Sequence, residues 1–283
     1  MKYTFIKSKK ELRSYLQTYE DRNYHIIALD LEAELNLHAY GERLCLIQIY
    51  DGTDAVLIDP FGLDTETLKV LFERKNILKV IYDASSDSSL MKNAYNIEIK
   101  PVLDLRPAVD ILNYEKKDLQ SVIASELGII LDNKAKYQKH NWTRRPLDEG
   151  AIDYALSDVV HLLKLKDAIL KKLCSRKLLE LFFLKNLEVN DKDYVRIPGD
   201  KYRKVKGYHD LSAGEKGVFR KLYDVREKYA KQYNMPPHNI ASGTALINTA
   251  RDARYVNEVR FPKRFSREMI LQIVQELGEV ARG

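Results

Sequence analysis

Three short apolar segments follow one another between residues 25 and 60, and they restrict the fold more than any other feature of the chain. They read HIIALDLE at 25–32, LCLIQIY at 44–50 and AVLIDP at 55–60, and turn residues such as Asp51 and Gly52 separate them. Short β-rich runs of this kind are typical of an antiparallel meander. A helical pattern at 65–73, a buried strand KVIYDA at 79–84 and a second helical pattern at 86–95 come next. This order predicts an α/β fold with a mixed sheet flanked by helices.

The later part of the chain is predicted to be mostly helical. From Leu103 the strand patterns fade and apolar residues recur every three or four positions, including one long helical run that begins near Asp148. Residues 189–208 lose this periodicity and carry Pro198, Gly199 and Gly207, as a linker does. We therefore predict a first domain at 1–190, a linker at 191–207 and a helical module at 208–283, with helices at 212–233, 243–251 and from 266.

Charge is distributed unevenly between these parts. Residues 1–158 carry 26 acidic and 21 basic side chains, a net charge of −5, whereas the remaining 125 residues carry 26 basic and 15 acidic side chains, a net charge of +11. This asymmetry favours a front part that holds cations and a rear part that attracts a polyanion such as nucleic acid, although a solvated helical surface has the same composition.

Composition and terminal sequence argue for a cytoplasmic protein without a membrane span. The chain is 45% hydrophobic and 31% charged, and no stretch approaches the roughly 18 consecutive apolar residues of a membrane helix. The first fifteen residues are charged throughout, unlike a signal peptide. Cys45 and Cys174 have no motif spacing, so we interpret both as structural.

Two carboxylates end the first apolar strand. Because strand side chains alternate, Asp30 and Glu32 project to one face while Leu29 and Leu31 project to the other. Like charges at this spacing repel each other and resist burial, so they need a cation or open water. A strand end emerging into solvent is the simpler interpretation.

Two further acidic positions are unusual. In the helical run from Asp148, the apolar stripe contains Tyr154 and Asp158, which are four residues apart and so share one helix face. Asp87 lies near the start of the helix after KVIYDA. Taken singly, Asp158 could be a buried partner of an arginine and Asp87 a helix cap. Taken together, the four carboxylates form a candidate site for the hard cations Mg²⁺ or Mn²⁺, and a pair of such ions can promote phosphodiester hydrolysis.

These blocks resemble the ribonuclease D family of Asp-Glu-Asp-Asp 3′-5′ exonucleases, in the subclass marked by tyrosine. The first motif is Asp30-Leu31-Glu32, followed by LCLIQI at 44–49; the second is VIYDASSD at 80–87, with Leu103-Asp104-Leu105 beyond it. The third contains Trp142, Arg145-Pro146-Leu147 and the segment YALSD at 154–158. The resemblance covers roughly residues 20–175 and departs from the family at Ala33, where an aromatic residue is usual.

The rear module is similar to the HRDC domain shared by RecQ-type helicases and ribonuclease D. The matching positions are Leu222, Arg226, Ala230, Pro236-Pro237, Ile240 and Leu246. The resemblance implies an RNase H-like mixed sheet with flanking helices, the 3′-5′ exonuclease fold, followed by a small all-α HRDC-type domain that binds nucleic acid. Better-known family members carry two HRDC domains, and this chain has room for one.

The resemblance also implies an activity and a set of site residues. Asp30, Glu32 and Asp158 would hold one divalent ion and Asp30 with Asp87 a second, while Tyr154 would orient the attacking water. The expected activity is 3′-5′ exoribonuclease, releasing 5′-mononucleotides from RNA with a free 3′ end, such as transfer RNA precursors. No protein partner or membrane association is predicted.

Substrate contacts and competing functions remain open at this point. Lys136, Gln138 and Arg145 precede the third motif and are candidate nucleic-acid contacts, although such residues are more often ordinary surface groups. A DNA exonuclease of the repair type would use the same cluster, because only contact with the 2′-hydroxyl separates the substrates. Two non-enzymatic functions compete with these: an inactive scaffold that binds nucleic acid, and a purely structural protein.

Overall fold

The computed structural model describes residues 2–22, 25–131, 136–196, 199 and 201–283. The chain divides into two compact units. The first comprises residues 1–33 and 43–196, and the second, the helical unit, comprises residues 34–42 and 197–283. Linker positions 197, 198 and 200 lie outside the described residues. Each unit is described separately below.

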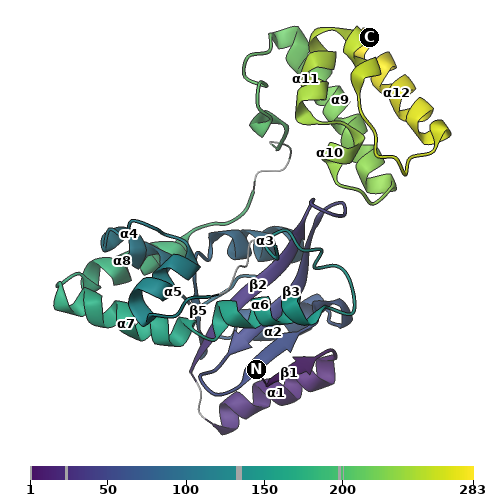
Figure 1. Ribbon diagram of the computed structural model, residues 1–283. Helices are drawn as coiled ribbons and strands as arrows, with labels where there is room; N and C mark the ends of the chain where they lie inside the picture. The colour runs from purple at the N-terminus through teal and green to yellow at the C-terminus, as the bar shows by residue number, and fades with distance from the viewer. Residues whose placement is uncertain (1, 23–24, 132–135, 197–198, 200) are drawn as a thin grey trace. The chain divides into compact units, whose positions relative to one another are not determined.

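The first unit is built on a mixed sheet of six strands in the order β1-β4-β3-β2-β5-β6 (Figure 1). Strands β3 and β4 pair antiparallel, whereas β1 pairs with β4, β2 with β5 and β5 with β6 in parallel. The predicted strands β2, β3 and β4 are neighbours in the sheet, as expected of a meander. The bounds are β1 Tyr3–Ile6, β2 Ile26–Leu35, β3 Glu42–Tyr50, β4 Ala55–Ile58, β5 Leu78–Ile81 and β6 Val102–Asp104.

Helices cover both faces of this sheet. Buried residues of α1, α2 and α3 form one core cluster with the sheet, and buried residues of α4 to α8 form another on the opposite face. The predicted helices at 65–73 and 86–95 are confirmed as α2 and α3. The bounds are α1 Lys9–Asp21, α2 Thr65–Phe72, α3 Ser85–Tyr95, α4 Arg106–Ile111, α5 Leu119–Leu127, α6 Glu149–Val159, α7 Leu162–Ser175 and α8 Leu179–Asp191, with a 3₁₀ turn at Pro60–Gly62.

The structure corrects the predicted elements at several places. Asp30 and Glu32 do not end the first strand, because β2 continues to Leu35. Strands β1 and β6, of four and three residues, were not predicted. The single long helix expected from Asp148 is two helices, because α6 ends at Val159 and α7 begins at Leu162. Two adjacent β-branched residues, Val159 and Val160, with low helix propensity stand at this break. Helix α8 also continues to Asp191, into the segment where periodicity is lost.

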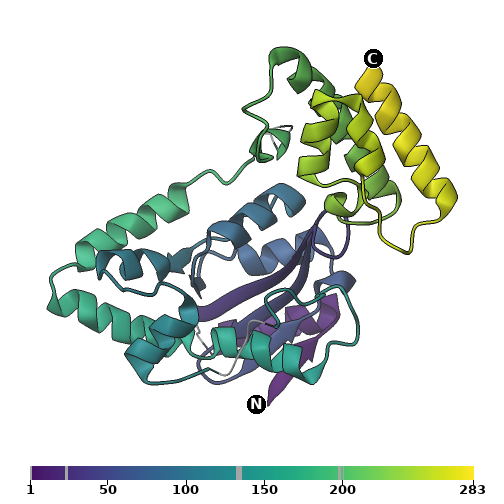
Figure 2. The same ribbon diagram turned by 45° about the horizontal axis from the view of Figure 1, so that its top comes forward.

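The helical unit contains α9 Ala213–Gln232, α10 Pro237–Ile240, α11 Gly243–Arg251 and α12 Arg267–Arg282, with 3₁₀ turns at Lys201–Lys204 and Ala253–Glu258. Figure 2 shows the yellow α12, which packs against α9 and the 3₁₀ turn at Ala253–Glu258. The predicted apolar positions Leu222, Ile240 and Leu246 are fully buried in its core. Serines cap three of these helices, since Ser212, Ser242 and Ser266 each accept an N–H bond from the first turn. Among the described helices, none is both long and apolar enough to cross a bilayer.

Candidate active site

Strand β2 presents two carboxylates to the face of the sheet that α6 covers. Leu29 and Leu31 are buried in the core under α1, α2 and α3. Asp30 and Glu32 alternate with them and are half-buried on the other face, the side on which Ala28 packs. The predicted alternation is therefore what the structure shows, and it directs both carboxylates toward α6.

Helix α6 supplies the third carboxylate. Asp148 caps its start by accepting the N–H of Ala151, and Ala151 and Ala155 bury one side of the helix. Asp158 lies on the same side of the helix and is also buried, with 8% of its surface exposed. One carboxylate oxygen from each of Asp30, Glu32 and Asp158 lies within 4.8 Å of the others. An all-oxygen, all-anionic donor set of this kind fits Mg²⁺ or Mn²⁺, which would balance the charge of the cluster.

Tyr154 lies one helical turn before Asp158 and is hydrogen-bonded to it. Burial, together with the negative charges of Asp158, Glu32 and Asp30, raises the pKa of Tyr154 above its ordinary value. The hydroxyl therefore stays protonated through the neutral range. It can orient a ligand by hydrogen bonding.

An aromatic cluster holds the Tyr154 ring. Its centroid lies 5.7 Å from that of Tyr137 and 6.0 Å from that of Trp142, which is 98% buried and packs edge-on against His140 at 4.9 Å. A side chain at Gly150 would overlap the Tyr137 hydroxyl and would have to displace the Tyr137 ring. Sequence reasoning noted Trp142 but gave no role to Tyr137 or Gly150.

Asp87 is not part of the three-carboxylate group. It lies in the first turn of α3, whose residues Leu90 and Met91 pack in the opposite core. Burial and the charges of Asp83 and Asp104 raise the pKa of Asp87 to about 7. Strand β5, which precedes α3, pairs in parallel with β2, the strand that carries Asp30, and it ends at Ile81, six residues before Asp87.

The three candidate nucleic-acid contacts lie in different environments. Lys136 and Gln138 are exposed on the turn that carries Tyr137. Arg145 is instead engaged within the protein: its guanidinium binds Asp59 at 2.6 and 3.1 Å and donates to the carbonyl oxygens of Cys45 and Trp142. It also lies 4.5 Å from the Phe61 ring centroid. These contacts indicate a structural task for Arg145, and sequence reasoning missed its partner Asp59.

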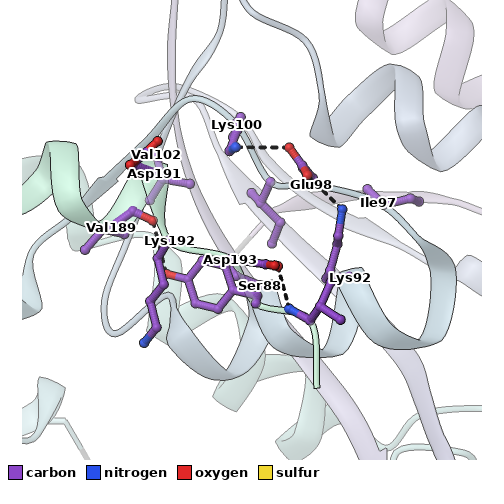
Figure 3. A pocket seen from close by; sticks show the side chains of 13 residues that line it. Ser88, Lys92, Ile97, Glu98, Lys100, Val102, Val189, Asp191, Lys192 and Asp193 are labelled. Carbon is purple, nitrogen blue, oxygen red and sulfur yellow. Dashed lines mark hydrogen bonds and ion pairs between the residues drawn. The ribbon is translucent and has the colours of Figure 1, made fainter. Parts of the chain in front are cut away.

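A pocket of about 260 Å³ lies beside α3, between the segment 97–102 and the end of α8 (Figure 3). None of the predicted site residues lines it. Its Glu98 carboxylate binds both Lys92, at 2.8 Å, and Lys100, at 3.0 Å, as the dashed lines in Figure 3 show. The pocket lining carries three basic and three acidic side chains, whereas the carboxylate cluster brings three acidic side chains together.

Comparisons with known proteins agree with this geometry. The profile of a family described as 3′-5′ exonuclease matches residues 3–174. Ribonuclease D of Jannaschia sp. is 26% identical over 253 residues, covering 87% of this chain and 64% of the relative. Ribonuclease D of Zymomonas mobilis is 30% identical over 230 residues, covering 79% and 58%. The chain spans 57% to 64% of the length of four of the curated relatives that it matches.

Solved structures show the same fold. The Escherichia coli RNase D structure, described as an exoribonuclease involved in structured RNA processing, superimposes with a TM-score of 0.72 at 23% identity, covering 100% of this chain and 75% of that one. The catalytic core of RRP6 from Trypanosoma brucei gives 0.77 at 22% identity, with 99% and 79% coverage. Brucella melitensis NrnC with bound Mg²⁺ gives 0.55 at 19% identity, with 67% and 90% coverage.

Three observations together define the class of this protein. They are the mixed sheet with flanking helices, the convergent carboxylate cluster, and the family match over more than half of the chain. The chain belongs to the 3′-5′ exonuclease family. Within this family it is ribonuclease D-like, with relatives of that name at 26% to 30% identity over most of its length. The predicted RNase H-like sheet and the helical region after it are confirmed, because the RNase D and RRP6 structures cover both.

Proposed function

We propose that the protein is a 3′-5′ exoribonuclease that removes 5′-mononucleotides from RNA with a free 3′ end. The observation that carries the proposal is the convergence of Asp30, Glu32 and Asp158 within 4.8 Å, beside the protonated hydroxyl of Tyr154. Carboxylates that converge in this way, each offering an oxygen to one point, are typical of divalent-cation sites. The names of the curated relatives support RNA as the substrate.

The chain's own groups account for the roles that hydrolysis requires. Asp30, Glu32 and Asp158 would hold one divalent ion, and Asp30 with Asp87 a second. The convergence of the first three carboxylates supports the first ion, and the Mg²⁺ bound to NrnC supports the choice of a divalent cation. Two bound ions would lower the pKa of a water and stabilise the leaving oxygen. Tyr154, held between Tyr137 and Trp142, would orient the attacking water.

We propose transfer RNA precursors as the cellular substrate and the cytoplasm as the location. Support for the substrate comes from the resemblance to ribonuclease D and from a structural relative described as acting in structured RNA processing. The proposal that Lys136 and Gln138 contact RNA is supported by their exposure on the turn of Tyr137, whose ring lies 5.7 Å from that of Tyr154. The role of Arg145 in RNA contact has less support, because its donors bind Asp59 and main-chain oxygens.

The basic segment from Lys164 to Lys206 and the helical unit would add sequence-independent phosphate contacts. Lys164, Lys171, Arg176 and Lys177 are exposed in this segment, whereas Lys172 is paired with Glu126. Removal of residues 201–283 should weaken RNA binding and flatten its salt dependence, because fewer phosphates are neutralised. An unchanged affinity and an unchanged salt slope in the shortened chain would contradict this assignment.

The proposed activity is tested with end-labelled single-stranded RNA and matched DNA, in Mg²⁺, Mn²⁺ or chelator, using the wild type and Asp30→Asn. We expect a metal-dependent ladder that shortens from the 3′ end of RNA and is absent in the variant. Preference for DNA would favour a repair-type exonuclease. Binding without any ladder would indicate an inactive scaffold.

A further inference from the structure

The turn that leads into α3 needs support from outside itself. Asp83 has φ +64°, a left-handed conformation that is unfavourable for a residue other than glycine, at a cost of about 1 kcal/mol. The N-cap residue of α3 is Ala84, whose side chain has no hydrogen-bond acceptor. Ala84 therefore cannot cap α3 with its side chain, yet this turn leads directly to Asp87, three residues further on.

Asp104, at the end of β6, supplies the missing acceptor. Its Oδ1 accepts the N–H of Asp83 at 2.9 Å and its Oδ2 accepts that of Ala84 at 3.0 Å. Oδ1 also accepts the N–H of Arg106 at 2.9 Å, at the start of α4. The carboxylate is thus occupied by three main-chain donors from two segments, and Asp104 is 97% buried.

Asp104 is itself fixed from two sides. Its strand pairs with β5, with Ile81 as its partner in the register. Asn186 of α8 accepts the Asp104 N–H at 2.7 Å and donates to its carbonyl oxygen at 3.2 Å. Because Asn186 is also buried, this pair of bonds forms without competition from water. Asp104 therefore connects the turn before α3 to a rigid part of the first unit.

We propose that Asp104 is a positioning residue for Asp87: its carboxylate holds the Asp83–Ala84 turn and thereby places Asp87 to complete a divalent-cation site. The inference rests on the proposed function, in which Asp87 holds one of two ions. Asp104 binds no ion in this scheme, because main-chain N–H groups already occupy its oxygens. Groups that orient metal ligands typically change metal affinity about 10-fold to 100-fold when they are replaced.

The test measures Mn²⁺ binding by the full chain without RNA, using calorimetry for affinity and stoichiometry. Asp104→Asn retains the size of the side chain but replaces one acceptor oxygen with a donor, which opposes a main-chain N–H. We expect one of the two ions to bind about tenfold more weakly. Exonuclease activity should then need a higher Mg²⁺ concentration and recover when Mg²⁺ is raised.

Three other variants make the result interpretable. Asp118→Asn is the matched control, since Asp118 caps α5 through the N–H of Ser121 and should leave Mn²⁺ affinity unchanged. Asp87→Asn should lose one ion. Asn186→Ala keeps the Asp104 carboxylate but removes the hydrogen bonds that fix its strand. It should lower the affinity for the same ion about threefold, a smaller change than that caused by loss of the acceptor itself.

The outcomes separate this inference from the proposed function. If Asp87→Asn loses an ion while a folded Asp104→Asn binds both as the wild type does, the positioning role is wrong and the two-ion site stands. If Asp87→Asn itself binds two ions, the ligand set of the proposed function is wrong. If Asp104→Asn does not fold, wild-type Mn²⁺ affinity in Asn186→Ala overturns the positioning role.

Discussion

The first unit holds charged groups in two settings that differ in what balances them. Asp30, Glu32 and Asp158 are three like charges that the fold brings within 4.8 Å. Asp59 is instead matched by Arg145, which binds it with two hydrogen bonds. The first arrangement is a donor set that fits a divalent cation, and the second is an ion pair between two side chains of the protein. Replacing a member of the first should therefore affect activity, and replacing a member of the second should affect stability.

The largest effect is expected for Asp158→Asn. Loss of one ligand from a divalent-cation site should lower the exonuclease rate by about three orders of magnitude, or about 4 kcal/mol in the barrier. The same change should leave the melting temperature of the metal-free protein unchanged or raise it, because one repulsive charge is removed. Asp153→Asn is the matched control, since Asp153 is exposed on the same helix.

A marked fall in melting temperature for metal-free Asp158→Asn would contradict this contrast between the carboxylate cluster and the Asp59–Arg145 pair. It would mean that the protein itself, and not a cation, balances the cluster. Scanning calorimetry with and without Mn²⁺ separates the two cases. Mn²⁺ should raise the melting temperature of the wild type more than that of the variant, because the ion binds the folded state.

The second largest effect is expected for Asp59→Asn, and it should appear in the stability of the protein and not in its exonuclease rate. Burial alone would raise the pKa of Asp59, but hydrogen bonds from Arg145 and the Phe61 N–H, with the charge of Arg145, bring it below the ordinary value. Breaking this partly buried pair should cost about 2 to 3 kcal/mol of unfolding free energy, measured by urea denaturation.

Asp64→Asn is the control for that measurement. Asp64 pairs with Lys9 at the surface, where both side chains are about half exposed, and an asparagine would still cap α2. Asp64→Asn should lower the unfolding free energy less than Asp59→Asn does, because solvent screens the exposed pair. Equal costs for the two variants would show that burial of the Asp59–Arg145 pair adds nothing to stability.

Lys79 provides a third case for this comparison, because its fully buried ammonium group is hydrogen-bonded to uncharged carbonyl oxygens. Its ammonium donates to the carbonyl oxygens of Arg74 and Lys100, both at 2.7 Å. Burial, with the charge of Arg74, lowers the pKa of Lys79 to about 7. The unfolded chain keeps this proton up to about pH 10, so the folded state binds fewer protons above pH 7 and stability rises with pH there.

The wild type should therefore gain about 2 kcal/mol in unfolding free energy relative to Lys79→Met between pH 7 and pH 9. Urea denaturation of both proteins at several pH values measures this difference. Lys75→Met, which changes an exposed lysine four residues earlier, should show no such dependence on pH. A constant difference between wild type and Lys79→Met would indicate that Lys79 stays charged throughout this range.

The sequence was sufficient to predict those parts of the site that depend on local periodicity. Strand alternation placed Asp30 and Glu32 on one face, and the four-residue spacing placed Tyr154 next to Asp158. Contacts between distant segments carry no such signal. Asp59 lies 86 residues from Arg145, and Asp104 lies 21 residues from Asp83, so their pairing depends on the finished sheet. The short strands β1 and β6 have too few residues to show a period.

The smallest effect is expected for Tyr154→Phe, and it tests whether the tyrosine orients water or removes its proton. The ring should keep its place between Tyr137 and Trp142, so the variant loses only the hydroxyl. We expect about a tenfold fall in kcat, or about 1.4 kcal/mol, with little change in KM.

Because the raised pKa keeps Tyr154 protonated, the activity profile from pH 7 to pH 9 should have the same shape in both proteins. If Tyr154 acted as a base, Tyr154→Phe would abolish any rise of the exonuclease rate with pH. It would also lower that rate as much as Asp158→Asn does. Agreement of the two profiles would assign the activation of water to the carboxylate cluster and its cations.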